Sequence, residues 1–205
     1  MATIPQRTIS QFKSKLIGGG ARPNLFEVQV NFPDGVDLGI QGDGGSTEFD
    51  GDRFRFLCKT AALPASNVSN LEVPFRGRVL KVAGDRTFEN WTVTVINDQD
   101  FGHYRNFQAW AQNIAQYGDS SGLTNPADYM GQATVYQLGR NAASQQGSNS
   151  PATDSDILAQ YKFVDIFPTT ISSIDLSYDT SDTIEEFTVD FQVQYWYPVA
   201  AGSGA

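Results

Sequence analysis

The residues that could carry covalent chemistry in this chain are few. It has a single cysteine, Cys58, and a single histidine, His103. A nucleophilic thiol needs a base within hydrogen-bond reach, and nothing in the sequence brings these two residues together. Cys58 alternates with Phe54 and Phe56, which predicts a small buried hydrophobe. His103 falls on the first turn of an expected helix, where we expect a surface or hydrogen-bonded side chain. The sequence therefore predicts that the protein is not an enzyme.

Sites for metals, cofactors and phosphates are equally scarce. Three glycines at residues 18–20 are not followed by Lys and Ser or Thr, as a phosphate-binding loop requires. Residues 34–52 are rich in Gly and Asp but lack the alternating acids and closing Glu of a calcium loop, so a solvated loop is favoured. One cysteine excludes an internal disulfide and argues against structural zinc. We expect no metal and no cofactor.

One binding chemistry stays open at this stage. The rings of Trp91, Trp110 and Trp196 could stack on sugars or peptides, so a monomeric carbohydrate- or peptide-binding β-sandwich module is an alternative function. Assembly separates the alternatives, because a binding module would stay monomeric at high concentration.

Length and charge set further limits. The 205 residues suffice for one domain that buries roughly 70% of its unfolded surface. Fourteen basic against twenty-three acidic residues give a net charge of −9, which argues against gripping nucleic acid through a basic face. No segment approaches the roughly 20 apolar residues of a membrane helix, and the first twenty residues lack the apolar run of a signal peptide. We expect no membrane partner and synthesis in a reducing cytoplasm.

Alternating apolar and polar residues predict a chain made mainly of strands. The predicted strands are residues 26–32, 54–58, 75–82, 91–96, 133–138, 157–166, 171–178 and 183–196. Tyr104, Phe107, Trp110 and Ile114 recur at helical spacing and predict a helix over 99–117 that packs on a sheet. The fold class is thus mainly β, an antiparallel β-sandwich or half-barrel with one packed α-helix. The expected core residues are Phe56, Cys58, Trp91, Val93, Val95, Phe107, Trp110, Phe187 and Phe191.

Smaller signals mark the ends of these elements. Asn97 and Asp98 are expected N-caps for the helix, and Gly118 is its expected C-terminal glycine. Gly84 with Asp85 is typical of a turn, and Gly77 indicates a bulge or a close backbone approach within a strand.

The domain organisation follows from composition. Residues 1–20 are interpreted as a flexible N-terminal arm with a short amphipathic helix, residues 21–197 as a single domain, and residues 198–205 as a C-terminal tail. Within the domain, residues 34–52 and 141–154 are low in hydrophobicity and are interpreted as loop insertions.

The segment from Thr60 to Ala83 is the strongest candidate for contact between copies. It is longer than a hairpin connection requires, and it carries Leu63 and other apolar residues with little local pattern to bury them. It also concentrates Arg76, Arg78 and Lys81 in an acidic chain. Two interpretations remain open for these cations: contact with an acidic neighbouring subunit, or a solvated strand face. Long strands with exposed edges favour self-pairing and closed rings.

Three motifs carry a resemblance to a known family. They are ARPNLFEVQV at residues 21–30, FLCKTAALPAS at residues 56–66 and AGDRTFENWTVTVIND at residues 83–98. Together, in this order, they resemble the tail tube protein of contractile-tailed bacteriophages, and the likeness extends weakly over residues 161–196. The inner tubes of bacterial contractile injection systems share this fold and are an alternative assignment.

The resemblance implies a structural virion protein. Six copies would form a ring, rings would stack inside the sheath, and strands from all subunits would complete a β-barrel tube through which DNA leaves without specific binding. The implied partners are further copies of the chain, the tail sheath protein, and baseplate and tail-terminator proteins. The implied location is the phage tail, assembled in the bacterial host cytoplasm.

The resemblance also directs attention to two residue sets. Because DNA must slide through the tube, the candidate lumen surface is the polar face of the last strand or of a strand beside it; on the last strand the residues are Glu186, Asp190, Gln192 and Gln194. The candidate contacts between subunits are Leu63, Pro64, Phe75, Arg76, Arg78, Lys81, Asp85 and Arg86.

Overall fold

The computed structural model describes residues 8–16, 20–38, 49–140, 157–179 and 182–199. The chain divides into a smaller compact unit, residues 1–26 with 136–160 and 199–205, and a larger one, residues 27–135 with 161–198. In the smaller unit, α1 (Ile9–Lys15) begins with a capping box between Thr8 and Gln11, which agrees with the short helix expected in the arm. The glycine hinge and the insertion at 141–154 lie largely or wholly outside the described residues, and the arm, domain and tail boundaries remain predictions.

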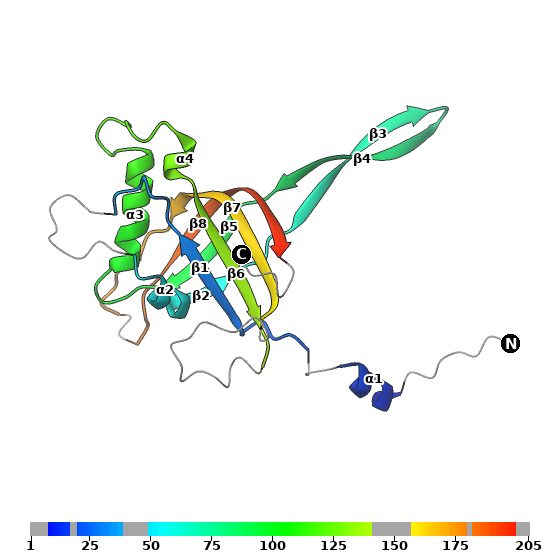
Figure 1. The fold of residues 1–205 in the computed structure, drawn as a ribbon, viewed down its shortest axis with the longest axis horizontal. Helices are drawn as coiled ribbons and strands as arrows, with labels where there is room; N and C mark the ends of the chain where they lie inside the picture. Colours follow the sequence, from blue (N-terminus) through cyan, green and yellow to red (C-terminus); the bar gives the residue numbers. More distant parts are fainter. Residues whose placement is uncertain (1–7, 17–19, 39–48, 141–156, 180–181, 200–205) are drawn as a thin grey trace. The chain divides into compact units, whose positions relative to one another are not determined.

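A six-stranded sheet forms the framework (Figure 1). Its strands, in spatial order, are β1 (Phe26–Asn31), β6 (Gly131–Leu138), β7 (Ile157–Ile171), β8 (Glu186–Val199), β5 (Trp91–Ile96) and β2 (Cys58–Ala61). The sheet curls into a nearly closed barrel, and helices are few. The predicted class, mainly β with one packed helix, is confirmed.

The core is built on the pairing of β5 with β8. The two strands run antiparallel, and Trp91 lies opposite Phe191 and Val95 opposite Phe187 in the register. Because both strands alternate with a period of two, this register places their apolar residues on one face. These residues, with Val93, are buried as the sequence predicts. Trp91 also stacks on Phe163 of β7, with ring centroids 4.5 Å apart.

The helix α3 (Gly102–Ile114) covers the buried face of β8. The rings of Phe107 and Trp110 lie 5.8 and 6.0 Å from the ring of Phe191, and both side chains are fully buried. The predicted helix and its packing face are therefore confirmed, although the helix is shorter than the predicted span of 99–117. It ends before Gly118, because its C-cap is Ala115.

The predicted helix caps are wrong. The N-cap of α3 is Phe101, a left-handed residue with φ 54° and no side-chain cap. Asn97 and Asp98 lie four and three residues before the N-cap, and their side chains make other contacts. The Asn97 amide donates to Glu185 at 3.1 Å, and a carboxylate oxygen of Asp98 lies 3.2 Å from the Arg53 guanidinium.

The predicted strand at 54–58 is instead the helix α2 (Gly51–Leu57), followed by β2. The carboxylate of Asp50 caps its first turn by accepting from the Arg53 amide at 2.9 Å. Residues two apart cannot share a helix face, whereas residues four apart can. Phe54 and Cys58 are therefore buried, and Phe56 is 83% exposed. The prediction of Phe56 as a core residue is wrong.

The segment expected as a connection and a bulged strand forms a long antiparallel hairpin, β3 (Ser66–Phe75) with β4 (Arg78–Phe88). Gly77 (φ 82°) does not mark a bulge but forms the two-residue turn with Arg76 (φ 45°), the pattern of a type I′ hairpin. Gly84 lies within β4, not in a turn. The register shifts across Ser69, and a Cβ at Gly84 would lie 2.5 Å from the Ser69 hydroxyl oxygen. Gly84 and Asp85 of β4 therefore face the single residue Ser69 of β3 in a bulge, and the missing Cβ of Gly84 permits the close approach there.

The predicted strand at 171–178 is absent from the described residues. Instead β7 continues past Pro168 to Ile171, and the Thr169 hydroxyl donates to the Asp190 carbonyl of β8 at 3.0 Å. Residues 172–178 then leave the sheet as an irregular connection in which Leu176 and Tyr178 are exposed. One further short helix, α4 (Pro126–Tyr129), precedes β6.

Candidate assembly surfaces

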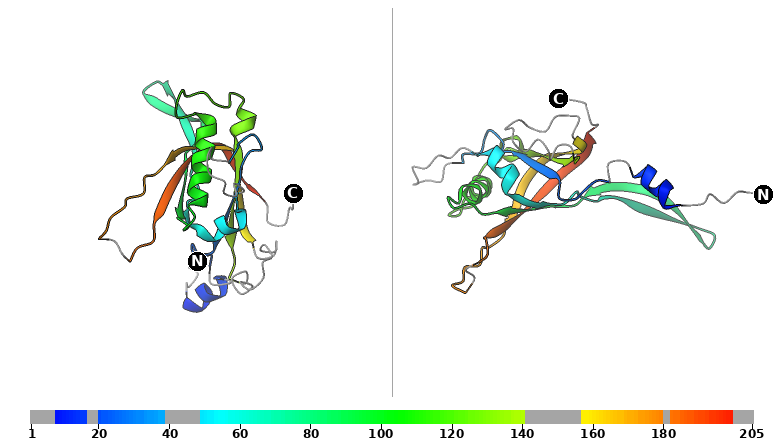
Figure 2. Two further views of the ribbon diagram at one scale, coloured as in Figure 1. Left: turned by 90° about the vertical axis from the view of Figure 1, so that its left-hand side faces the viewer. Right: turned by 90° about the horizontal axis from the view of Figure 1, so that it is seen from below.

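The β3–β4 hairpin extends away from the sheet of the larger unit (Figures 1 and 2). Every residue of β3 is exposed, and of β4 only Phe88 is partly covered. Ten-residue strands rise about 33 Å, so the hairpin reaches well past its base. Its exposed large apolar side chains are Val68, Leu71, Val73, Phe75, Val79, Leu80 and Val82. The segment has no core of its own within the subunit.

The charges of the hairpin gather toward its tip, defined here as Phe75 to Arg78. The Arg76 guanidinium lies over the Phe75 ring, 5.3 Å from its centroid. Arg76 and Arg78 form no salt bridge with any residue that the structure describes, whereas Lys81 lies 3.9 Å from Glu72 on the opposite strand. The tip therefore offers two arginines beside exposed apolar side chains.

The sequence-predicted contact residues lie in two places. Six of them come together on the hairpin: Phe75, Arg76, Arg78, Lys81, Asp85 and Arg86. Leu63 and Pro64 lie between β2 and β3, at the base, where Leu63 is exposed and Pro64 is half-buried.

The predicted lumen residues alternate along β8 with its buried residues; they are Glu186, Asp190, Gln192 and Gln194. The Asp190 carboxylate accepts from the Thr92 hydroxyl at 2.6 Å, and the hydroxyls of Thr94 and Thr188 lie 3.5 Å apart. Glu186 pairs with Lys59 at 2.6 Å. This face of β5 and β8 is polar, and Lys59 on the neighbouring strand β2 is neutralised by a carboxylate.

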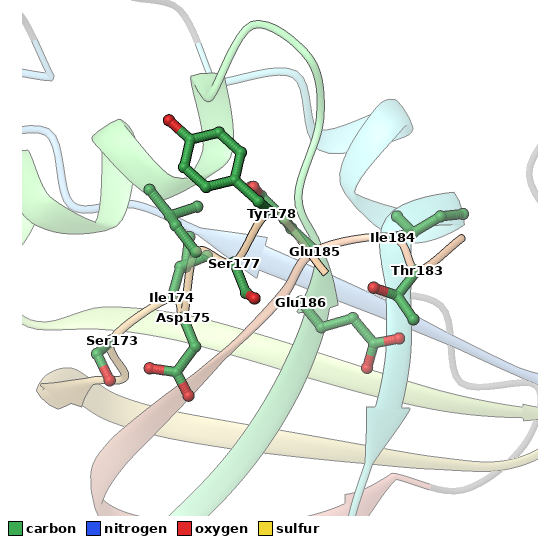
Figure 3. A pocket seen from close by; sticks show the side chains of 10 residues that line it. Ser173, Ile174, Asp175, Ser177, Tyr178, Thr183, Ile184, Glu185 and Glu186 are labelled. Atoms are coloured by element: carbon green, nitrogen blue, oxygen red, sulfur yellow. The ribbon is translucent and has the colours of Figure 1, made fainter. Parts of the chain in front are cut away.

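Sequence reasoning missed a third surface, because it expected a strand there. The connection between β7 and β8 encloses an open hollow of about 640 Å³ (Figure 3). The lining residues belong to its two legs, residues 173–178 and 183–186. We name this surface the β7–β8 hollow. The sequence signal for this surface was the alternation of Ile174, Leu176 and Tyr178, for which the sequence offers no evident packing partner.

The chain's reactive groups are buried in the structure. Burial raises the pKa of the Cys58 thiol to about 12, and its Sγ donates to the Thr60 carbonyl at 3.7 Å. A thiol in this state is a poor nucleophile.

His103 lies between the rings of Phe49 and Phe54, with centroids 5.4 and 5.7 Å away. Neither ring nitrogen has a hydrogen-bond partner in the part of the chain that the structure describes. The expected surface or hydrogen-bonded histidine is therefore wrong. Burial lowers the pKa of His103, and the nearby Asp98 carboxylate opposes that shift.

Other binding chemistries find little support. Trp91 and Trp110 are fully buried, and Trp196 is half-buried against Phe88 and Tyr161, so these indoles offer no open stacking platform. Within the described residues, no group of His, Cys, Asp and Glu side chains could hold a metal ion. Among the same residues, no helix combines the length and hydrophobicity needed to cross a membrane.

Comparison with known proteins identifies the family of the chain. Residues 21–198 match the family model described as phage tail tube protein. This chain belongs to the phage tail tube protein family. It is 31% identical over 179 residues to tail tube protein gp19 of Enterobacteria phage T4, covering 87% of this chain and 92% of that protein. The tail tube protein of Serratia phage KSP90 is 23% identical over 190 residues, covering 90% and 93%.

Solved structures share the fold of this tail tube protein. A chain of the sheath-tube complex of the PVC extracellular contractile injection system, in its extended state, has a TM-score of 0.55 at 13% identity and covers 94% of this chain and 97% of that one. A chain of the anti-feeding prophage baseplate has a TM-score of 0.55 at 9% identity, covering 89% and 97%. The resemblance seen in the sequence is confirmed: the protein is a structural component of a contractile phage tail and of the virion.

Proposed function

We propose that copies of this tail tube protein form hexameric rings that stack into the inner tube, a conduit for DNA in which no bond is made or broken. The observation that carries the proposal is the β3–β4 hairpin, with seven large apolar side chains exposed. Two-stranded hairpins are marginal in water, and contiguous apolar patches mark interaction sites. A neighbouring copy would bury these side chains and supply the missing core.

The tube itself would form by strand pairing between subunits. The sheet of one chain is nearly closed but has edges at β1 and β2, and exposed edges invite pairing. A ring removes free edges because each copy meets the next in the same way. Strands of all subunits would then complete a β-barrel around a common lumen.

The polar face of β5 and β8 is the surface we assign to the lumen. Facing lysines or arginines would each add a salt-dependent phosphate contact, which would slow sliding DNA. Beside this face, Lys59 of β2 pairs with Glu186, and on it the Asp190 carboxylate accepts a hydrogen bond from Thr92. The remaining candidates, Gln192 and Gln194, are neutral. DNA would pass without specific binding.

The partners of the tube follow from its place in the tail. Names of the similar solved structures mention a sheath-tube complex, a baseplate and a sheath/tube terminator. By analogy we propose contacts with the tail sheath, baseplate and tail-terminator proteins, and assembly in the host cytoplasm. No membrane, metal or catalytic step is part of this function.

Electron microscopy and sedimentation velocity of the purified protein test the proposal. We expect rings or tubes for the wild type. Replacing Phe75 and Leu80 by serine should abolish them while circular dichroism stays unchanged, because both side chains are exposed, at 67% and 62%. Tyr117→Ser, at an exposed aromatic residue outside the hairpin, is the control and should still assemble. A wild type that remains monomeric, or hairpin variants that form normal tubes, would refute the proposal.

A further inference from the structure

The β7–β8 hollow has the features of a docking surface. Its two legs face each other across an open space of about 640 Å³, in the range of about 300–1,000 Å³ that proteins use for ligands (Figure 3). Leu176 is 80% exposed and Ile184 is 71% exposed, and the ring of Tyr178 also lies in solvent. Large apolar side chains held in the open around a hollow indicate that something covers them.

The charge around the hollow has one sign. Residues 173–186 contain five acidic residues and no basic residue. Two of the acids have partners inside the subunit, because Glu186 pairs with Lys59 and Glu185 accepts from Asn97. Asp175, Asp179 and Asp182 form no salt bridge with any residue that the structure describes. Asp175 lines the hollow, and Asp179 and Asp182 adjoin its two legs, so the hollow combines exposed apolar side chains with unpaired negative charge.

The hairpin tip has the complementary character. Residues 66–88 contain four basic and two acidic residues in a chain of net charge −9. The tip places Arg76 and Arg78, which lack salt bridges among the described residues, beside Phe75, Val79 and Leu80. Opposite charges speed association and fix register, while buried apolar area supplies most of the affinity. We propose that the hairpin tip of one copy docks in the β7–β8 hollow of the next copy, which deepens the proposed function and rests on it.

The placement of the two surfaces suits repeated assembly. Both belong to the larger unit, and the hairpin and the β7–β8 connection point away from opposite ends of it (Figures 1 and 2). A contact between two different surfaces of identical chains is head-to-tail. An open series of such contacts therefore keeps one free hairpin at one end and one free hollow at the other. Such contacts generate rings when the rotation closes and filaments when it does not. One interface therefore accounts for continued addition of subunits.

Charge reversal tests the pairing. Arg78→Glu and Asp175→Lys should each raise the protein concentration needed for assembly by about tenfold or more at low salt, since tenfold corresponds to about 1.4 kcal/mol. The chain with both substitutions should assemble at a concentration near the wild-type value, because the charges are exchanged. Arg22→Glu, which changes an exposed charge in the smaller unit, is the control and should have little effect. If the combined variant is no better than the worse single variant, the pairing is wrong.

Cysteine trapping gives an independent result. Cys58 is buried with a raised pKa, so introduced cysteines dominate oxidation chemistry. Oxidised assemblies of the Arg78→Cys, Asp175→Cys chain should give a ladder of covalent multimers in non-reducing gels, whereas Arg78→Cys with Asp34→Cys should not. Tubes without the ladder would overturn the docking but leave the proposed function standing. Failure of the wild type to assemble at all would overturn both.

Discussion

The indole Nε1 of Trp110 donates a hydrogen bond of 2.8 Å to the backbone carbonyl oxygen of Tyr129. This bond joins α3 to the end of α4, just before β6 begins. The same indole lies 4.7 Å from the Phe32 ring and is fully buried. A single side chain thus links α3 to the residue that follows β1 by packing and to α4 by a hydrogen bond.

Trp110→Ala should lower the free energy of unfolding by about 3–5 kcal/mol, because it leaves a large cavity and an unpaired carbonyl. Urea unfolding of the unassembled protein, followed by circular dichroism, measures this. Trp110→Phe should cost less, since it keeps most of the apolar contact and loses the hydrogen bond. Equal stability of Trp110→Ala and the wild type would mean that α3 is not packed as described.

How far the sequence predicts this fold depends on whether a pattern is local. The strands β5 and β8 and the helix α3 were predictable because each has a long, regular apolar period. The short segment around Phe54 and Phe56 fits both periods, and the cap that decides it, from Asp50, is a single contact. Chain pattern alone could not separate a helix from a strand there.

The hairpin and the β7–β8 hollow were harder to predict for a different reason. Composition identified the residues of the hairpin as unburied and basic, but Gly77 and Gly84 exchanged their expected roles, because only the register across Ser69 distinguishes a turn from a close approach. The hollow arises where β7 extends past Pro168 to Ile171 and residues 172–178 form an irregular connection in place of the predicted strand. Both outcomes depend on pairing between strands far apart in sequence.

Gly84→Ala should weaken tube assembly with little effect on the stability of the monomer. A Cβ at Gly84 would lie 2.5 Å from the Ser69 hydroxyl oxygen and 3.2 Å from its carbonyl oxygen, so the hydroxyl must rotate away and the two strands must shift slightly apart at the bulge. The hairpin contributes little to the subunit core, because its residues are exposed. Sedimentation velocity measures assembly, and urea unfolding measures stability.

Ser69→Ala provides the check on that explanation. It removes the nearest atom, so the Gly84→Ala, Ser69→Ala chain should regain part of the lost assembly. If Gly84→Ala assembles like the wild type, the close approach at the bulge does not shape the docking hairpin.

His103 should make the stability of the protein pH-dependent near neutrality. Burial lowers its folded-state pKa below the ordinary value of 6.5, so the unfolded chain binds the proton more readily. Above about pH 6.5 the histidine is mainly neutral in both the folded and the unfolded state, so it does not lower the free energy of unfolding. That free energy falls as the pH drops through 6.5 toward the folded-state pKa. The slope reaches at most about 1.4 kcal/mol per pH unit for one proton.

Urea unfolding of the unassembled protein between pH 6 and 8 measures this slope. Because the chain has no other histidine, His103→Phe should flatten it, and the phenyl ring suits the aromatic neighbours Phe49 and Phe54. The charged groups near His103 are Asp98, Arg53 and Asp50, and all three are present in both proteins. An equal slope in the variant would exclude His103 as its source.

Positive charge on the polar face of β8 should slow DNA release from phage particles. If Asp190 and Gln192 face the lumen, Asp190→Lys or Gln192→Lys places an ammonium group beside moving phosphates, and each contact releases counterions as it forms. The delay should therefore be largest at low salt and shrink as salt rises, which distinguishes phosphate contact from a misfolded tube. Two variants serve as controls for this prediction. Asp190→Asn removes the acid without adding a cation; it retains an acceptor for the Thr92 hydroxyl and should release DNA at nearly the wild-type rate.

Asp34→Lys makes the same change in net charge as Asp190→Lys, but at an exposed site outside β8, and should also leave release unchanged. Release is followed by the fluorescence of a DNA-binding dye after contraction is triggered, with electron microscopy confirming intact tubes. Wild-type rates for both lysine variants at low salt would move the lumen to another face of the subunit.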